Sequence, residues 1–143
     1  MDRKSKNAGR WVLTLANLIT VTASVAADWN ETHVFNERWP SHARFHEVVG
    51  LGMTASLATL ALTALWTDPD QRDRLVSGRE LAAGVPLAYW GPFFPALLVR
   101  GTGYEDAPHP VGRLAGVPTN LLGAAATIST AIGGWLLDRR MRP

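Results

Sequence analysis

Residues 48–67 read VVGLGMTASLATLALTALWT, a run of 20 residues without one Lys, Arg, Asp or Glu. Three further stretches, 11–27, 81–99 and 114–137, are equally free of charge and contain 17, 19 and 24 residues. A helix needs about 20 apolar residues to cross a bilayer, and it pairs its backbone amides internally. A soluble helix bundle would need a polar face on each helix. The pattern therefore predicts an all-α integral membrane bundle of four transmembrane helices, at about 10–28, 42–67, 80–100 and 117–137.

The composition narrows the class of protein further. The chain has 143 residues, of which 14 are Lys or Arg, 12 are Asp or Glu and none is Cys. This length predicts a single domain over 1–143. Without Cys there is no disulfide scaffold, Cys-ligated metal or catalytic cysteine. No phosphate-binding loop, dinucleotide fingerprint or nucleic-acid module is present, so we expect the lipid bilayer and no nucleic acid as partner. The oligomeric state, self-association included, stays open.

The distribution of basic residues predicts the orientation in the membrane. Ten Lys and Arg lie in the N-terminal segment, the 68–80 loop and the C-terminal tail, whereas four lie in or next to the 28–42 and 101–116 loops. Lys and Arg accumulate on the cytoplasmic side. We therefore expect a multi-pass protein with both termini in the cytoplasm and the 28–42 and 101–116 loops outside.

The first span permits two interpretations. A basic start, an apolar stretch and the small residues at 24–27 also fit a cleavable signal peptide. However, Asn17, Thr20, Ser24 and Asp28 follow at spacings of 3, 4 and 4, which places them on one helical stripe. A permanent helix can turn such a stripe toward its neighbours, so we favour a retained span.

The other spans carry packing signals. Small and hydroxyl residues form one stripe in the second span and another in the fourth, which predicts close helix contacts or a polar cavity. These stripes are Gly52, Ser56, Thr59 and Thr63, and Asn120, Gly123, Thr127, Thr130 and Gly134. The third span contains Pro86, Pro92 and Pro95, which predict a kinked or locally open helix. Tyr89 and Trp90 lie at its middle and are suited to form the wall of an apolar site, or simply to pack.

The candidate site lies on the predicted outer side, because every His is found in or next to its two loops. Pro40-Ser41 predicts a helix start, after which His42 and His46 share one face at the i, i+4 spacing. We expect acid–base chemistry from histidines and Glu47, with an arginine holding an anionic group. The candidate catalytic residues are His33, His42, His46 and Glu47, and the candidate ligand-binding residues are Asp28, Asn36, Arg38, Arg44, Tyr89, Trp90 and His109.

Three functional hypotheses remain open. The first is a site that binds or transforms a small lipophilic molecule, and no cofactor is identified. The second is a non-enzymatic accessory protein or transporter subunit whose outer loop docks a partner. The third is a metal site with His42 and His46 as weak ligand candidates, since two imidazoles one turn apart reach one ion. A purely anchoring role for Arg44, His46 and Glu47 at the helix end is the structural alternative.

The segment WNETHVFN at 29–36, continued by WPSHARFH at 39–46, resembles a motif of small four-span membrane proteins of bacteria and fungi that are functionally uncharacterised. The likeness covers 18 residues and the general layout of spans. It implies that this segment carries the site, and it supplies no reaction.

Overall fold

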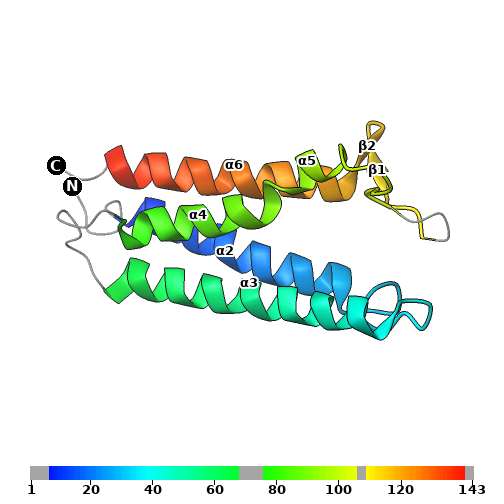
Figure 1. Ribbon diagram of the computed structural model, residues 1–143. Coiled ribbons are helices and arrows are strands. Elements are labelled where there is room, and N and C mark those ends of the chain that lie inside the picture. Colours follow the sequence, from blue (N-terminus) through cyan, green and yellow to red (C-terminus); the bar gives the residue numbers. More distant parts are fainter. Residues whose placement is uncertain (1–6, 68–75, 106–108, 141–143) are drawn as a thin grey trace.

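The computed structural model describes residues 7–67, 76–105 and 109–140 and is mostly helical. Its helices are α2 (Ala8–Asp28), α3 (Ser41–Thr67), α4 (Gly78–Trp90), α5 (Phe93–Ala96) and α6 (Thr119–Arg140). β1 (Arg113–Leu114) and β2 (Val117–Pro118) form a small antiparallel hairpin. The long helices run side by side as an elongated bundle (Figure 1). α2 begins and α6 ends at one end, which we call the packed end, and the segments 29–40, 97–105 and 109–118 lie at the other, the loop end.

Three of the described helices, α2, α3 and α6, are long and apolar enough to cross a membrane. α4 has 13 residues and is too short to do so alone. The structure therefore agrees with a membrane protein.

The proline-rich segment is broken, as its sequence predicts. α4 ends at Trp90 rather than continuing toward residue 100, and the chain resumes helix only for the four residues of α5. Pro86 remains inside α4, whereas Pro92 and Pro95 follow closely after Gly91 and remove two backbone donors within one turn. The helix is therefore shorter than the predicted span.

The polar stripe of α2 faces the bundle interior, which confirms the prediction. Asn17 and Thr20 are fully buried and Ser24 is nearly so. Asn17 Nδ2 donates to the carbonyl of Ala82 at 2.6 Å, and Trp90 Nε1 donates to Thr20 Oγ1 at 3.1 Å. These polar groups thus join α2 to α4, where they replace hydrogen bonds that lipid cannot offer.

The prediction that the stripe of the second span makes helix contacts or lines a polar cavity is wrong. Its four residues are all exposed on the outside of α3, and they are Gly52, Ser56, Thr59 and Thr63. α3 instead buries a neighbouring row, which is Leu51, Thr54, Ala58, Ala61 and Leu65. Both rows have helical spacing, and the larger buried side chains contribute more contact area. In α6, Thr127 and Gly134 of the predicted stripe are buried, whereas Gly123 is exposed and lines the cavity described below.

At the packed end the helices approach each other through glycines. A Cβ atom at Gly9 would lie 2.3 Å from the backbone of Asp138, and one at Gly78 would lie 2.4 Å from the backbone of Ala64. Asp138 is 1% exposed and lies 3.3 Å from Arg79 Nη1 and 3.9 Å from Arg10 Nε. These contacts connect α2, α4 and α6 in one cluster, which we call the Asp138 cluster.

Candidate functional site

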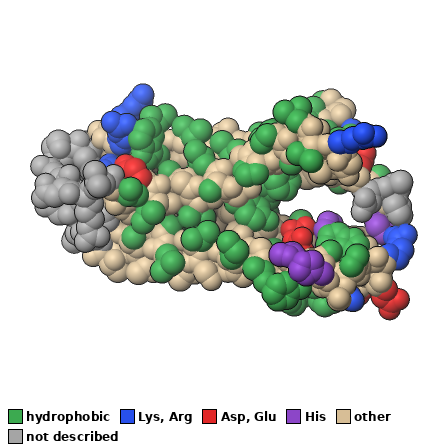
Figure 2. Space-filling view, viewed as in Figure 1, with side chains coloured by type: hydrophobic (Ala, Val, Ile, Leu, Met, Phe, Trp, Pro, Cys, Tyr) green, Lys and Arg blue, Asp and Glu red, His purple; other side chains and the backbone are tan. Residues whose placement is uncertain are grey.

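A cavity of about 830 Å³ opens at the loop end. Its lining comes from α2, α4, α5 and α6, and from the described parts of the 28–42 and 101–116 loops, which were both predicted to lie outside. Figure 2 shows the molecule hollowed at this end, with Asp, Glu and His side chains beside the hollow. The break after Trp90 contributes to the shape of the cavity, because Phe93 and Leu97 line it and would lie elsewhere if α4 continued as a straight helix.

The wall of the cavity is mainly apolar and aromatic. Ile19, Ala23 and Ala27 line it from α2, and Leu97 and Val111 from the loop side. The aromatic lining residues are Trp39, Tyr89, Trp90, Phe93 and Tyr104. Trp90 is the centre of this group, with ring centroids 4.8 Å from Tyr89 and 5.0 Å from Phe93. Such a wall favours an apolar or aromatic molecule.

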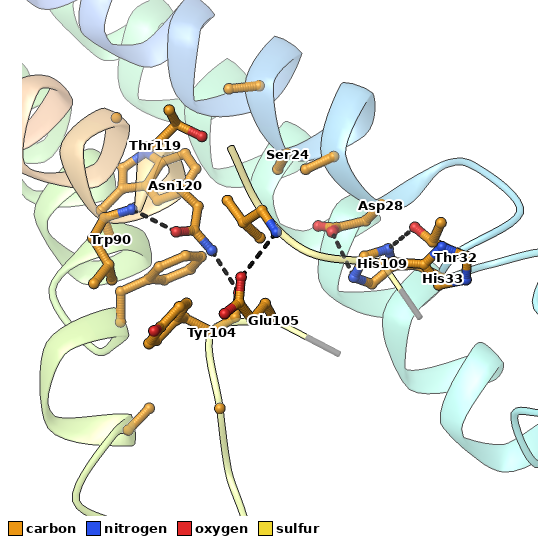
Figure 3. Close-up of a pocket in the computed structure, with 18 of the residues that line it drawn as sticks. Ser24, Asp28, Thr32, His33, Trp90, Tyr104, Glu105, His109, Thr119 and Asn120 are labelled. Atoms are coloured by element: carbon orange, nitrogen blue, oxygen red, sulfur yellow. Dashed lines mark hydrogen bonds and ion pairs between the residues drawn. The ribbon is translucent and has the colours of Figure 1, made fainter. Parts of the chain in front are cut away.

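Asp28 and His33 form the polar end of the cavity on the side of α2 (Figure 3). Thr32 Oγ1 lies 2.6 Å from Asn30 Oδ1 and 2.7 Å from His33 Nδ1. The hydroxyl has one proton and the amide oxygen only accepts, so Nδ1 of His33 donates to Thr32. His33 Nε2 lies 3.7 Å from Asp28 Oδ1. This contact places a carboxyl group and an imidazole side by side at the cavity.

The 29–40 loop is dense in polar residues because it fixes this geometry with its own side chains. Asn30 Oδ1 accepts from the backbone amide of Thr32 at 2.8 Å, and Asn36 Nδ2 donates to the carbonyl of Thr32 at 3.0 Å. The ring of Trp39 packs edge-on against His33 at 5.3 Å. Asx-type turns of this kind give a loop a defined conformation. His33 is therefore held in place rather than free to rotate.

The opposite side of the cavity carries a second polar group. Glu105 Oε1 lies 2.7 Å from Arg113 Nη2, and Glu105 Oε2 accepts from the amide of Val111 at 3.0 Å. Arg113 also donates to the Tyr104 hydroxyl at 3.0 Å. This hydrogen bond and the charge of Glu105 raise the pKa of Arg113, which keeps the guanidinium charged. Asn120 Nδ2 ties the loop to α6 through the carbonyl of Tyr104.

The structure brings five of the predicted site residues to this cavity, namely Asp28, His33, Tyr89, Trp90 and His109. His33 and His109 come from separate loops, and Figure 3 shows both beside the same cavity. The other candidates do not line it, and these are Asn36, Arg38, His42, Arg44, His46 and Glu47. Glu47 nevertheless lies close enough to interact with Asp28. Asn36 is used to stabilise the loop.

His42 and His46 share one face of α3, as their spacing predicts. Their Nε2 atoms are 3.0 Å apart, and both side chains are exposed. Within residues 7–67, 76–105 and 109–140, no group of three or more His, Asp or Glu side chains is arranged to hold a metal ion. The pair of imidazoles therefore has no further ligand in the described part of the chain.

Sequence reasoning missed much of the aromatic and polar lining. Trp39, Phe93 and Tyr104 lie in loops or next to prolines, where no periodic pattern assigns a face. Glu105 stands directly after Tyr104 in a loop, and its pairing with Arg113 of β1 and with the amide of Val111 places it at the cavity. The one usable signal was the proximity of Glu105 to His109 in the same loop.

A comparison with protein families now identifies the chain. Residues 12–142 match the model of a family of unknown function, DUF6640. The chain belongs to the DUF6640 family. Neither the curated proteins nor the solved structures contain a match. DUF6640 membership agrees with the uncharacterised family that the 29–46 segment suggested, and the match covers all of the described helices except the first four residues of α2.

Proposed function

We propose that this DUF6640 protein is a four-span membrane protein that binds a small lipophilic molecule in the cavity at its outer end. The cavity itself is the observation that carries the proposal. It combines an aromatic wall with a carboxyl–imidazole pair, Asp28 and His33, at one polar end. Most ligand sites have this character, an apolar enclosure with a few polar groups that fix orientation.

The fourth span in this proposal is the broken segment of α4 and α5. Residues 81–99 contain no charged side chain, and α4 packs against α2, α3 and α6. A broken helix is tolerated at membrane depth where it lines a cavity, since neighbouring helices and water satisfy the freed backbone groups. Burial of the α2 polar stripe against α4 supports α2 as a retained span.

The proposed orientation places both termini in the cytoplasm and the cavity on the opposite side. It is supported by the excess of Lys and Arg in the terminal segments and the 68–80 loop. The bound molecule would then enter from the outer leaflet or the outer solution. The carboxyl group of Asp28 and the imidazole of His33 would be available for proton exchange with a polar group of that molecule.

A paired substitution on α6 tests the binding proposal. Gly123 lines the cavity, and a Cβ atom there would meet no atom within 4 Å. Gly133 has the same free space and does not line the cavity. We expect Gly123→Leu to weaken binding of the neutral dye Nile red to purified protein in uncharged detergent by about tenfold, because the side chain occupies the site.

Gly133→Leu adds the same side chain to the outside of the same helix and serves as the control. It should leave the fluorescence titration of Nile red unchanged. Equal dye binding by the unmodified protein and both variants would contradict the proposal, because the dye would then be located in the micelle or on the outer helix surface.

A further inference from the structure

The described wall of the cavity contains acidic side chains but no Lys or Arg. The described lining residues contain two carboxyl groups, Asp28 and Glu105, and two histidines, but no Lys or Arg. Asp28 Oδ1 lies 3.7 Å from His33 Nε2, and Glu47 is a further carboxyl group close enough to interact with Asp28. Arg113 pairs with Glu105 from outside the lining. A bound anion would therefore meet Asp28 and Glu105 but no Lys or Arg side chain in the described part of the wall.

The aromatic wall also favours a cation over an anion. The face of an aromatic ring carries partial negative charge and attracts a cation within about 6 Å of its centre. One ring of the wall already does so, since the Arg113 guanidinium lies 5.4 Å from the centre of the Tyr104 ring. The rings of Tyr89, Trp90 and Phe93 also line the cavity, and no Lys or Arg is among its described lining residues.

We infer that the ligand of this cavity is a lipophilic organic cation, such as a quaternary or protonated amine with an apolar body. This inference rests on the proposed binding function and specifies its chemical class. The apolar body packs against Trp90, Tyr89 and Phe93, and the positive charge lies near Asp28. The site differs in this respect from the arginine-held anion that the sequence suggested, because Arg38 and Arg44 do not line the cavity.

Two probes of nearly equal shape and opposite charge test the sign. Tetraphenylphosphonium and tetraphenylborate are titrated separately against Nile red bound to purified protein in uncharged detergent. Only displacement that is absent in Gly123→Leu is counted, which removes partition into the micelle. We expect the cation to displace the dye at a concentration at least about tenfold lower than the anion.

Asp28→Asn then tests the assigned carboxyl group. It should reduce the preference for the cation about tenfold, whereas Glu37→Gln, an exposed carboxylate of the same loop outside the lining, should leave the preference intact. The comparison of the two probes does not depend on the folding of Asp28→Asn, because it uses only the unmodified protein and Gly123→Leu. Equal displacement, preference for the anion, or a preference that survives in Asp28→Asn would each overturn the inference while dye binding stands. If Gly123→Leu leaves Nile red binding unchanged, the proposed function itself is overturned.

Discussion

The two ends of the bundle are built from the same kinds of helix and differ in how closely those helices approach. On α6, a Cβ atom at Gly134 would lie 3.0 Å from the backbone nitrogen of Leu13, whereas one at Gly123 would meet nothing within 4 Å. Eleven residues along one helix thus separate close packing from open space. Glycine has opposite uses at the two positions, since it permits helix contact at Gly134 and leaves room for a ligand at Gly123.

The polar residues divide in the same way. At the packed end, Asp138 forms ion pairs with Arg10 and Arg79 across three helices. At the loop end, the Asp28–His33 pair faces a cavity. Without a hydrophobic driving force between helices in lipid, close contacts and interhelical polar bonds must hold the bundle together. We infer that the packed end provides the stability that allows the loop end to remain open.

The largest expected effect comes from removing the centre of the Asp138 cluster. Asp138→Ala leaves the largely buried guanidinium groups of Arg10 and Arg79 without that carboxylate, and breaking such a pair costs about 3–5 kcal/mol. We expect a corresponding loss in the free energy of unfolding, measured by denaturation in mixed micelles. Glu37→Ala removes an exposed carboxylate at the loop end and should change stability by less than about 0.5 kcal/mol. Similar losses for the two variants would contradict the proposed division between the ends.

A somewhat smaller loss is expected from filling the α2–α6 contact. In Gly9→Leu the new side chain begins 2.3 Å from the backbone of Asp138, so one helix must move. Overpacking of this kind costs about 1–3 kcal/mol. Thermal unfolding in detergent should show a clear decrease in Tm for Gly9→Leu, while Gly133→Leu, which faces open space, should retain the original Tm. A stable Gly9→Leu protein would show that α2 and α6 do not pack as described.

Local pattern was sufficient to predict the three long helices α2, α3 and α6 and one of their contacts, whereas the predicted helix over 80–100 is broken after Trp90. The stripe of Asn17, Thr20 and Ser24 has few alternatives, because polar residues in an apolar span must find partners inside the bundle. In α3 the same reasoning failed, because Gly52 and its companions are small enough to face lipid at little cost while Leu51 and Leu65 fill the interior. Spacing identifies a stripe, but the stripe that is buried depends on the neighbouring helices.

The site was predicted in part for a similar reason. His33 and His109, from the two loops that hold or adjoin every histidine, line the same cavity, and Tyr89 and Trp90 are part of its wall. His42 and His46 lie on a face of α3 whose direction the i, i+4 spacing does not define. The position of Phe93 depends on where the helix breaks after Trp90, which proline content indicates only approximately.

The smallest expected effect concerns the bond between Trp90 and Thr20, which links the wall of the cavity to the packed interior. Trp90 Nε1 donates to Thr20 Oγ1 at 3.1 Å, and both side chains are buried. Trp90→Phe removes the donor and Thr20→Val the acceptor, so the double variant should be less destabilised than the sum of the single ones. We expect a coupling energy of about 0.6–1 kcal/mol from a double-mutant cycle of unfolding free energies. Strictly additive losses would show that Trp90 is held only by its ring contacts, and that the cavity wall is independent of the polar stripe of α2.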